Sequence, residues 1–268
     1  MTLIGRKVLA VITGASRGIG RETVLQLSKI VSEGSAFLIT AKTATKLERL
    51  KNEVKSSTKG IDIYVLVCDA EKLNSGMISE FQEAVSTLTG NSRTFDALLL
   101  MHNAGTVGDV TKPGLEICSS DDWHNYLHIN FVSAVLINNS VLRAVPKQAV
   151  SVRYILNVTS LLAVKAFPSL AQYSVGKAAR EAFFRALAVE EPNLRILQYS
   201  PGPVQTDMHD ELAQKSYDKD IRKTLQTQSM SSEIKMRTLS PSETVKKMLE
   251  ILDKDEFENG SRCDFFDS

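Results

Sequence analysis

Tyr173 and Lys177 are two reactive side chains whose spacing suggests acid–base chemistry. They stand four residues apart in a segment rich in helix-forming residues, so both lie on one face of the predicted helix. A free tyrosine has a pKa of about 10, and a nearby ammonium lowers that pKa. Ser160 follows an apolar segment upstream, and its hydroxyl can donate to a carbonyl oxygen while Tyr173 delivers a proton. The three residues therefore predict proton transfer at a carbonyl group.

A glycine-rich segment near the N-terminus predicts a phosphate site. It runs T-G-A-S-R-G-I-G over residues 13–20, directly after an apolar run and directly before a helical pattern. Glycine permits a sharp turn with positive φ and lets the backbone approach a pyrophosphate closely. The following helix directs its first N–H groups at the anion. We therefore expect a dinucleotide to contact this segment through Gly14, Ser16, Arg17, Gly18, Ile19 and Gly20.

The end of the second apolar run distinguishes the two nicotinamide dinucleotides. NAD sites usually carry Asp or Glu there, which binds the ribose 2′-hydroxyl, whereas this chain has Ala41-Lys42-Thr43. Lys42 and Arg17 attract a 2′-phosphate, so the sequence favours NADPH. Asp69 and Ala70 follow the third run, where the adenine edge would lie; the alternative for Asp69 is a plain helix N-cap.

The elements that must position these residues alternate between short apolar runs and helix-length segments. This alternation predicts an α/β fold, namely a Rossmann-type, doubly wound parallel sheet with helices on both faces in a single domain over residues 1–268. The predicted strands are Lys7–Thr13, Ser35–Ala41, Ile61–Val67, Phe95–Met101, Val152–Thr159 and Leu194–Ser200, with a seventh at Arg262–Phe266. The predicted helices are Gly18–Ile30, Thr43–Ser57, Lys72–Leu88, Asp121–Val145, Leu170–Glu190 and Pro241–Lys254.

One segment, Asp207–Leu239, differs from the rest because it is polar and only weakly periodic. It follows the sixth predicted strand, and the carboxyl ends of parallel strands are where ligands bind. We therefore expect a lid-like excursion over a substrate.

Composition excludes several classes of protein. The 32 basic residues nearly balance the 31 acidic ones, so the formal net charge is +1 and a nucleic-acid partner is not expected. The longest apolar stretches fall far short of the roughly 20 residues that a membrane span needs. The three cysteines form no disulfide framework or zinc pattern, and the cytoplasm is the expected compartment. His124 and His128 are four apart, but no third ligand is evident, so no metal is expected.

Together these residues resemble the short-chain dehydrogenase/reductase family over essentially the whole chain. Further matches are N-A-G at Asn103, Ala104 and Gly105, and P-G-x-x-x-T from Pro201 to Thr206. The resemblance implies that Asn130 supports a proton-relay water as a fourth catalytic residue beside Ser160, Tyr173 and Lys177. It also implies that Pro201, Gly202, Val204, Thr206 and Met208 line the nicotinamide, and that Lys177 holds its ribose. His102 departs from the asparagine common in the family.

Within the family, the chain is most similar to the sepiapterin reductase subfamily. The matching segments include H-N-A-G-T-V-G-D at 102–109, S-P-G-P-V-Q-T-D-M at 200–208 and the C-terminal stretch 253–267. The resemblance implies reduction of a pterin side-chain ketone, in 6-pyruvoyl-tetrahydropterin or sepiapterin, during tetrahydrobiopterin synthesis. Asp264 then anchors the pterin, since a carboxylate accepts two hydrogens of its guanidine-like edge. The implied substrate-binding residues are Ser160, Leu162, Leu170, Tyr173, Gly202, Met208 and Asp264; Leu162 and Leu170 depart from the usual vertebrate residues.

Two other functions stay open at this point. The chain could reduce other dicarbonyls, such as benzil-type diketones, or it could be a non-catalytic NADPH-binding regulator. A homodimer is expected, because the family commonly packs the helix that carries Phe183, Phe184 and Leu187 across a dimer axis. The alternative for this apolar stripe is the protein core.

Overall fold

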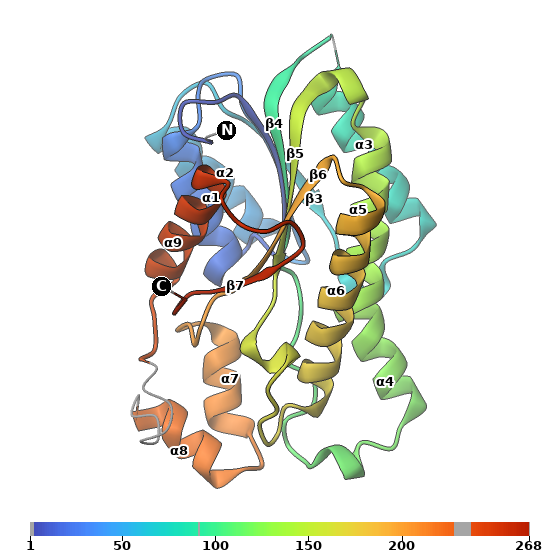
Figure 1. The fold of residues 1–268 in the computed structure, drawn as a ribbon, viewed down its shortest axis with the longest axis vertical. Helices are drawn as coiled ribbons and strands as arrows, with labels where there is room; N and C mark the ends of the chain where they lie inside the picture. Colours follow the sequence, from blue (N-terminus) through green and yellow to red (C-terminus); the bar gives the residue numbers. More distant parts are fainter. Residues whose placement is uncertain (1–2, 91, 228–236, 268) are drawn as a thin grey trace.

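Seven parallel strands form the centre of the molecule in the computed structural model, which describes residues 3–90, 92–227 and 237–267 (Figure 1). Their order across the sheet is β3-β2-β1-β4-β5-β6-β7. Every pairing is parallel. The strands are β1 (Val8–Thr13), β2 (Ala36–Ala41), β3 (Asp62–Val67), β4 (Phe95–His102), β5 (Val150–Val158), β6 (Leu194–Ser200) and β7 (Arg262–Asp264). The predicted doubly wound sheet is confirmed.

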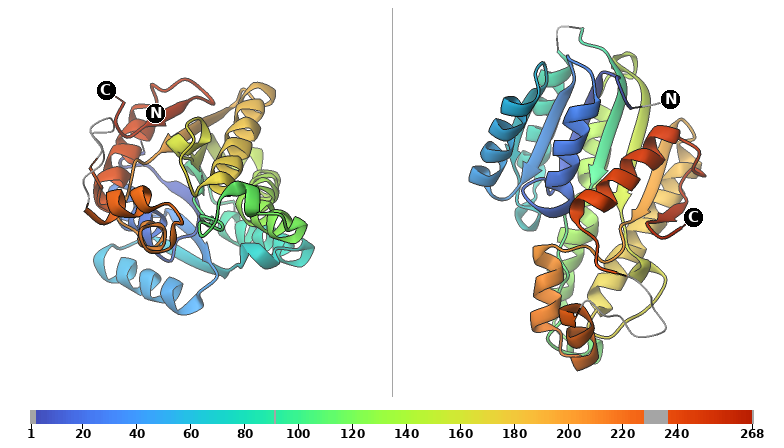
Figure 2. Two further views of the ribbon diagram at one scale, coloured as in Figure 1. Left: turned by 90° about the horizontal axis from the view of Figure 1, so that it is seen from below. Right: turned by 90° about the vertical axis from the view of Figure 1, so that its left-hand side faces the viewer.

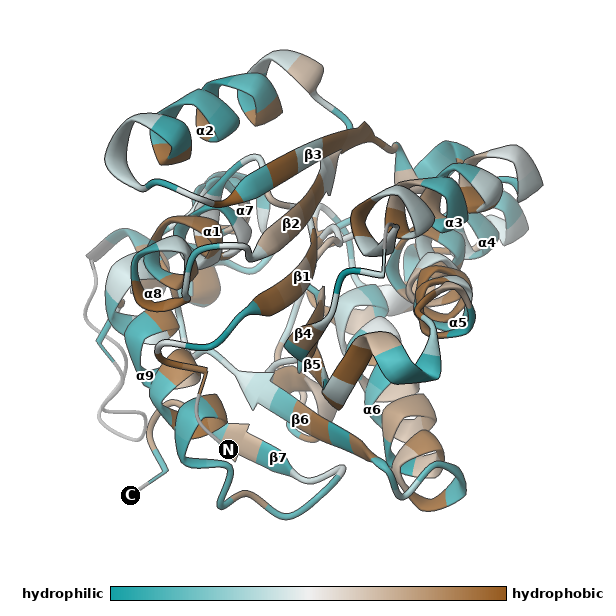
Figure 3. Ribbon diagram, turned by 90° about the horizontal axis from the view of Figure 1, so that it is seen from above, coloured by the Kyte–Doolittle hydropathy of each residue, from teal (hydrophilic) through white to brown (hydrophobic). Residues whose placement is uncertain are grey.

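Helices cover both faces of this sheet, as Figure 3 shows from above. One face packs against α1 (Gly18–Ile30), α2 (Ala44–Ser57) and α9 (Pro241–Lys254). The other face packs against α3 (Ser75–Thr89), α5 (Ser133–Ala144) and α6 (Ala171–Glu190). Because helices bury both faces, β1 and β2 are buried along their whole length and read as continuous apolar runs. The edge strand β3 instead alternates between buried and exposed residues.

The strand order reverses direction at β1, which lies between β2 and β4. In open α/β sheets, a crevice opens at such a switch point beyond the carboxyl ends of the strands. The glycine-rich segment follows β1 and the N-A-G element follows β4, so both lie at this crevice. The topology therefore brings together segments almost 90 residues apart in the sequence.

Two predicted helices differ from the observed ones at points that matter for the site. The single helix expected over 121–145 consists of α4 (Ser120–Leu127), a π-helical turn (His128–Val132) and α5. The helix expected from Lys72 begins at Ser75, because Asn74 caps it by accepting a hydrogen bond from the Met77 N–H (3.2 Å). The seventh strand is shorter than expected and ends at Asp264.

The polar segment after β6 contains two helices, α7 (Asp207–Lys215) and α8 (Lys219–Thr227), packed against each other below the carboxyl edge of the sheet (Figures 1 and 2). The turn between them is fastened to the body by a Ser169–Ser216 hydroxyl pair (2.6 Å) and by the Tyr217 N–H, which donates to the Val110 carbonyl (2.7 Å). Residues 228–236 of the predicted excursion lie outside the described residues.

Candidate active site

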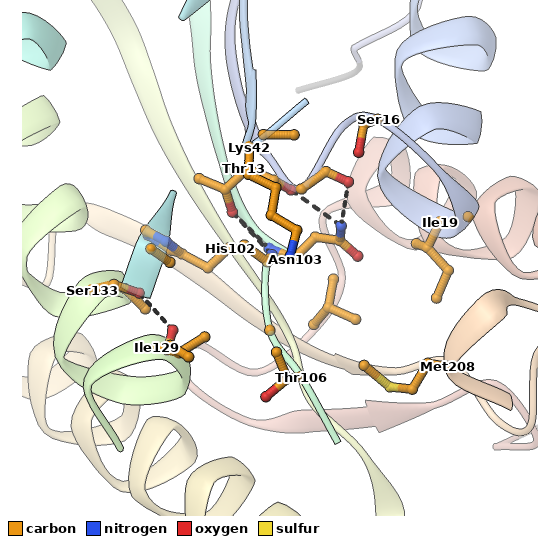
Figure 4. Close-up of a pocket in the computed structure, with 18 of the residues that line it drawn as sticks. Thr13, Ser16, Ile19, Lys42, His102, Asn103, Thr106, Ile129, Ser133 and Met208 are labelled. Carbon is orange, nitrogen blue, oxygen red and sulfur yellow. Dashed lines mark hydrogen bonds between the residues drawn. The ribbon is translucent and has the colours of Figure 1, made fainter. Parts of the chain in front are cut away.

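A cleft of about 420 Å³ lies at the carboxyl edge of the sheet, where the topology predicts a ligand site (Figure 4). Its walls come from the ends of β1, β2, β4, β5 and β6 and from the start of α7. The predicted cofactor residues that line it are Gly14, Ser16, Arg17, Gly18, Ile19, Ala41, Lys42, Thr43, Asp69, Ala70, Asn103, Ala104, Gly105, Tyr173, Lys177, Pro201, Thr206 and Met208.

The glycines of the 13–20 segment are required by the backbone geometry. Gly14 and Gly18 have φ values of +68° and +52°, a region that side chains disfavour. Gly20 lies behind the loop rather than on the cleft wall, and a Cβ there would sit 2.6 Å from Asn103 Nδ2. Arg17 precedes α1 in extended conformation and makes no side-chain cap. The first N–H groups of α1 are therefore left for a ligand anion.

Asn103 joins this loop to the end of β4, as the dashed lines in Figure 4 show. Its amide Nδ2 donates to the carbonyls of Thr13 (3.1 Å) and Gly14 (3.2 Å), and its backbone N–H donates to Thr13 Oγ1 (3.0 Å). None of these contacts involves the side chain of His102. The departure at His102 therefore leaves the function of Asn103 in the loop intact.

The end of the cleft beyond β2 carries positive charge. Lys42, which precedes α2, lines it as predicted, and so does Lys46 in the first turn of α2. Arg17 lines it too, but its guanidinium is ion-paired with Asp207 at the start of α7. Asp69 lines the cleft and also caps the turn after β3, by accepting a hydrogen bond from the Glu71 N–H (3.2 Å). The N-cap is therefore observed, and the contact of Asp69 with the adenine edge stays a prediction.

Ser160, Tyr173 and Lys177 lie close together; Tyr173 and Lys177 line the cleft, whereas Ser160 is not among the described residues that line it. Ser160 caps the short turn after β5, and its hydroxyl is hydrogen-bonded to Tyr173. Lys177 is buried; its ammonium lies 5.4 Å from the centroid of the Tyr173 ring and donates to the carbonyl of Val158 (2.7 Å). The predicted proximity of the three side chains is observed.

The electrostatics of Tyr173 differ from the expectation. Burial raises the pKa of Tyr173, while the Ser160 hydrogen bond and the charge of Arg180 lower it. The expected lowering by Lys177 is wrong in this structure, because burial and the charge of Arg180 hold the pKa of Lys177 itself well below its usual value.

Asn130 lies in the π-helical turn between α4 and α5, a kind of irregularity that is frequent at functional sites. Its side-chain oxygen accepts from the Thr106 N–H (2.8 Å), and its amide donates to the Tyr126 carbonyl (3.0 Å). The side chain thus supports the loop after Gly105, and its part in a proton-relay water stays a prediction.

The expected substrate residues fall into two groups. Leu170 belongs to a small apolar cluster with Val107 and Val110, against which Leu162, Tyr173 and Met208 also pack. Asp264 is not one of the described residues that line the cleft. It pairs in register with Ser200, whose hydroxyl donates to its carboxylate (2.8 Å). Gly202 and Val204 also lie off the cleft wall; a Cβ on Gly202 would meet Phe266 at 2.9 Å.

Several cleft residues were missed by sequence reasoning, and two of them had a usable signal. Lys46 stands four residues after Lys42, in the first turn of the predicted helix Thr43–Ser57, so it is a second lysine close to the end of the second run. Arg180 stands seven residues after Tyr173, two turns along the same face. Thr106, Ile129 and Ser133 also line the cleft, and nothing in their local pattern marked them.

Within residues 3–90, 92–227 and 237–267, no group of three metal-ligating side chains is arranged to hold an ion. Among the same residues, no helix is both long enough and apolar enough to cross a membrane.

The comparisons with known proteins agree with this geometry. The profile of the short chain dehydrogenase family matches residues 8–217. Sepiapterin reductase from Bos taurus is 34% identical over 263 residues, covering 97% of this chain and 95% of that enzyme. Sepiapterin reductase from Xenopus laevis is 32% identical, covering 97% and 96%.

A solved structure supports the fold. L-Sorbose reductase from Gluconobacter frateurii, complexed with NADPH and L-sorbose, superposes with a TM-score of 0.79 at 24% identity, covering 98% of this chain and 97% of its own. The chain belongs to the short-chain dehydrogenase family of oxidoreductases, which act on carbonyl and alcohol groups, and resembles sepiapterin reductases over nearly its whole length.

Proposed function

We propose that this protein is an NADPH-dependent carbonyl reductase that acts on the side-chain ketone of a pterin. The observation that carries the proposal is Tyr173, which lines the same cleft as the glycine-rich loop, has its hydroxyl hydrogen-bonded to Ser160 and has the Lys177 ammonium 5.4 Å from the centroid of its ring. A non-catalytic regulator needs the cleft but not these three reactive side chains, so we do not favour that alternative.

The cleft fits a nicotinamide dinucleotide. The positive-φ glycines leave room for a pyrophosphate, and the uncapped start of α1 offers it N–H donors. Lys42 and Lys46 stand where a 2′-phosphate would lie, and Ala41 occupies the position of the acidic residue typical of NAD sites. A bound NADPH supplies the hydride.

The chain's own residues then handle the proton and the carbonyl. Ser160 holds the carbonyl oxygen by hydrogen bonding, and Tyr173 donates the proton to that oxygen as the alcohol forms. Lys177 holds the ribose by hydrogen bonding, while the Ser160 hydrogen bond and the charge of Arg180 lower the pKa of Tyr173. Asn130 keeps the loop after Gly105 in place, beside the proposed proton relay.

The pterin as substrate is supported by the similarity to sepiapterin reductases and by Asp264. Its carboxylate has one hydrogen bond from Ser200, and the Arg262 Nε lies 3.8 Å away. It stands one strand beyond Pro201 at the same sheet edge as the cleft. Tetrahydrobiopterin synthesis is the process in which such a reductase acts, and the cytoplasm is the compartment we propose.

The helices α7 and α8 are the proposed substrate lid, since Met208 on α7 lines the cleft and packs toward Leu170. A homodimer is proposed through α5 and α6. Phe184 is core, but Leu136 on α5 (41% exposed) and Val189 on α6 (82% exposed) are apolar and lie at the surface. The mass of the protein in solution, compared with 29.5 kDa for one chain, tests the dimer.

The Lys42→Asp variant is expected to shift the cofactor preference from NADPH toward NADH by one to two orders of magnitude in kcat/KM. A carboxylate there repels the 2′-phosphate and can accept from a ribose 2′-hydroxyl. Steady-state kinetics with both cofactors measure the shift. Lys55→Asp, at the other end of α2, is the matched control. An unchanged preference in Lys42→Asp would count against the assigned 2′-phosphate site.

The Asp264→Ala variant is expected to raise the KM for sepiapterin at least tenfold and to leave a benzil-type diketone little affected. The reason is that only the pterin offers an N–H edge to a carboxylate. Kinetics on both substrates with one enzyme preparation show whether the loss is confined to sepiapterin. An equal loss on both substrates would mean that Asp264 supports the fold near Ser200 rather than the pterin.

A further inference from the structure

Arg180 on α6 is the largest fully buried side chain in the described part of the protein, with 1% of its surface exposed. Its guanidinium donates to Asn157 Oδ1 on β5 (2.9 Å) and to the carbonyls of Ala104 (3.1 Å) and His102 at the end of β4. The last two acceptors flank Asn103, which holds the glycine-rich loop. Arg180 thus joins α6, β5 and the N-A-G element at the back of the cleft.

All three acceptors of Arg180 are uncharged, so no bonded carboxylate cancels its charge within the described residues. Burying such a charge is costly, and an apolar side chain of similar volume could fill the same space without that cost. Glu181 is the nearest acidic residue on α6, but its two oxygens bond Thr159 (2.7 Å) and Arg185 (3.4 Å). The cost of burial indicates that the charge itself has a use.

The titratable groups around the guanidinium are Tyr173, Lys177 and Glu181 on α6, Tyr126 on α4 and His102 on β4. Tyr173, Lys177 and Arg180 lie along one helical face, at intervals of four and three residues. The positive charge of Arg180 lowers the pKa of Tyr173 and, after burial, that of Lys177. It also helps to keep His102 neutral, with a pKa of about 3.

We propose that Arg180 is a positioning residue whose guanidinium fixes the N-A-G element against β5 and brings a buried positive charge to the face of α6 that carries Tyr173 and Lys177. The catalytic use of this charge rests on the proposed reductase activity. Its effect on Lys177 does not depend on that activity. A guanidinium suits the task because it stays charged at any pH at which the protein works. Burial alone would leave the hydroxyl of Tyr173 a weaker acid.

The experiment is a titration of Lys177 by NMR in protein labelled with ¹³C at the lysine Cε, with Lys177→Met to assign the signal. In Arg180→Met the midpoint is expected to rise by about one pH unit, because a like charge nearby has been removed. Asn157→Asp keeps the guanidinium and its hydrogen bond but places a negative charge against it, so the midpoint should also rise. Arg143→Met, which removes an exposed charge from α5, should leave it unchanged.

If Arg180→Met does not fold, the midpoint of the Lys177 titration in Asn157→Asp tests the proposal instead. A midpoint unchanged from wild type in the folded variants would overturn the proposal and reduce Arg180 to a packing residue. The pH profile of kcat/KM for reduction is the second measurement, and its basic limb should move upward with the NMR midpoint. A purely structural defect lowers the rate at every pH and leaves the limb in place. Absence of turnover in the wild type would instead contradict the proposed function, while the NMR result would still stand.

Discussion

The Tyr173→Phe variant is expected to lose about 10²- to 10⁴-fold in kcat for carbonyl reduction while binding NADPH nearly as well as wild type. The substitution removes only the hydroxyl, which is the group that Ser160 orients and that would donate the proton. The ring, which lies against the Lys177 ammonium and the apolar cluster of Leu170, remains. The loss should therefore fall on chemistry rather than on binding or folding.

The measurement compares single-turnover rates and cofactor affinity in Tyr173→Phe and in Tyr64→Phe. Tyr64 is exposed on the edge strand β3, so its hydroxyl is a matched control outside the cleft. A Tyr173→Phe enzyme within threefold of the wild-type rate would contradict the assignment of Tyr173 as the proton donor. A parallel collapse of NADPH affinity would instead assign the hydroxyl to cofactor binding.

The Gly20→Ala variant is expected to lose most of its dinucleotide affinity and to unfold at lower temperature. An added Cβ would lie 2.6 Å from Asn103 Nδ2 and would also meet the Gly14 backbone. Either the loop or Asn103 must move, and overpacking of this kind typically costs about 1–3 kcal/mol. This cost outweighs the gain of up to about 1 kcal/mol that alanine normally brings inside a helix.

Gly76→Ala is the matched control for this prediction, because Gly76 also lies in the first turn of a helix, α3. Its Cβ would lie 3.2 Å from Asn74 Oδ1, the cap oxygen, and would meet no backbone there. Thermal unfolding and fluorescence titration with NADPH measure both variants. An unaltered affinity in Gly20→Ala would show that the close approach of β1, α1 and Asn103 does not shape the phosphate site.

Much of this architecture could be predicted from the sequence because local patterns determine it. The apolar runs that became β1 and β2 are buried on both sides, so their composition alone marked them. The glycine-rich loop was recognisable because it joins such a run to a helix. Tyr173 and Lys177 were recognisable because helical spacing is set by local geometry.

The remaining features depend on contacts between distant segments. The pairing of Arg17 with Asp207 joins residues 190 positions apart, and no pattern near either residue indicates it. The π-helical turn at Asn130 interrupts a segment whose composition suits one continuous helix. The direction of the Tyr173 pKa shift depends on burial and on Arg180, both of which arise only once α6 packs against β4 and β5.

The most direct measurement is the oxidation of NADPH by the purified protein with sepiapterin, run beside a benzil-type diketone and with Tyr173→Phe as the blank. We expect the wild type to turn over sepiapterin with a higher kcat/KM than the diketone. This turnover should be lost in Tyr173→Phe. Turnover of the diketone without turnover of sepiapterin would contradict the pterin assignment. Absence of turnover with either substrate would contradict the assignment as a carbonyl reductase.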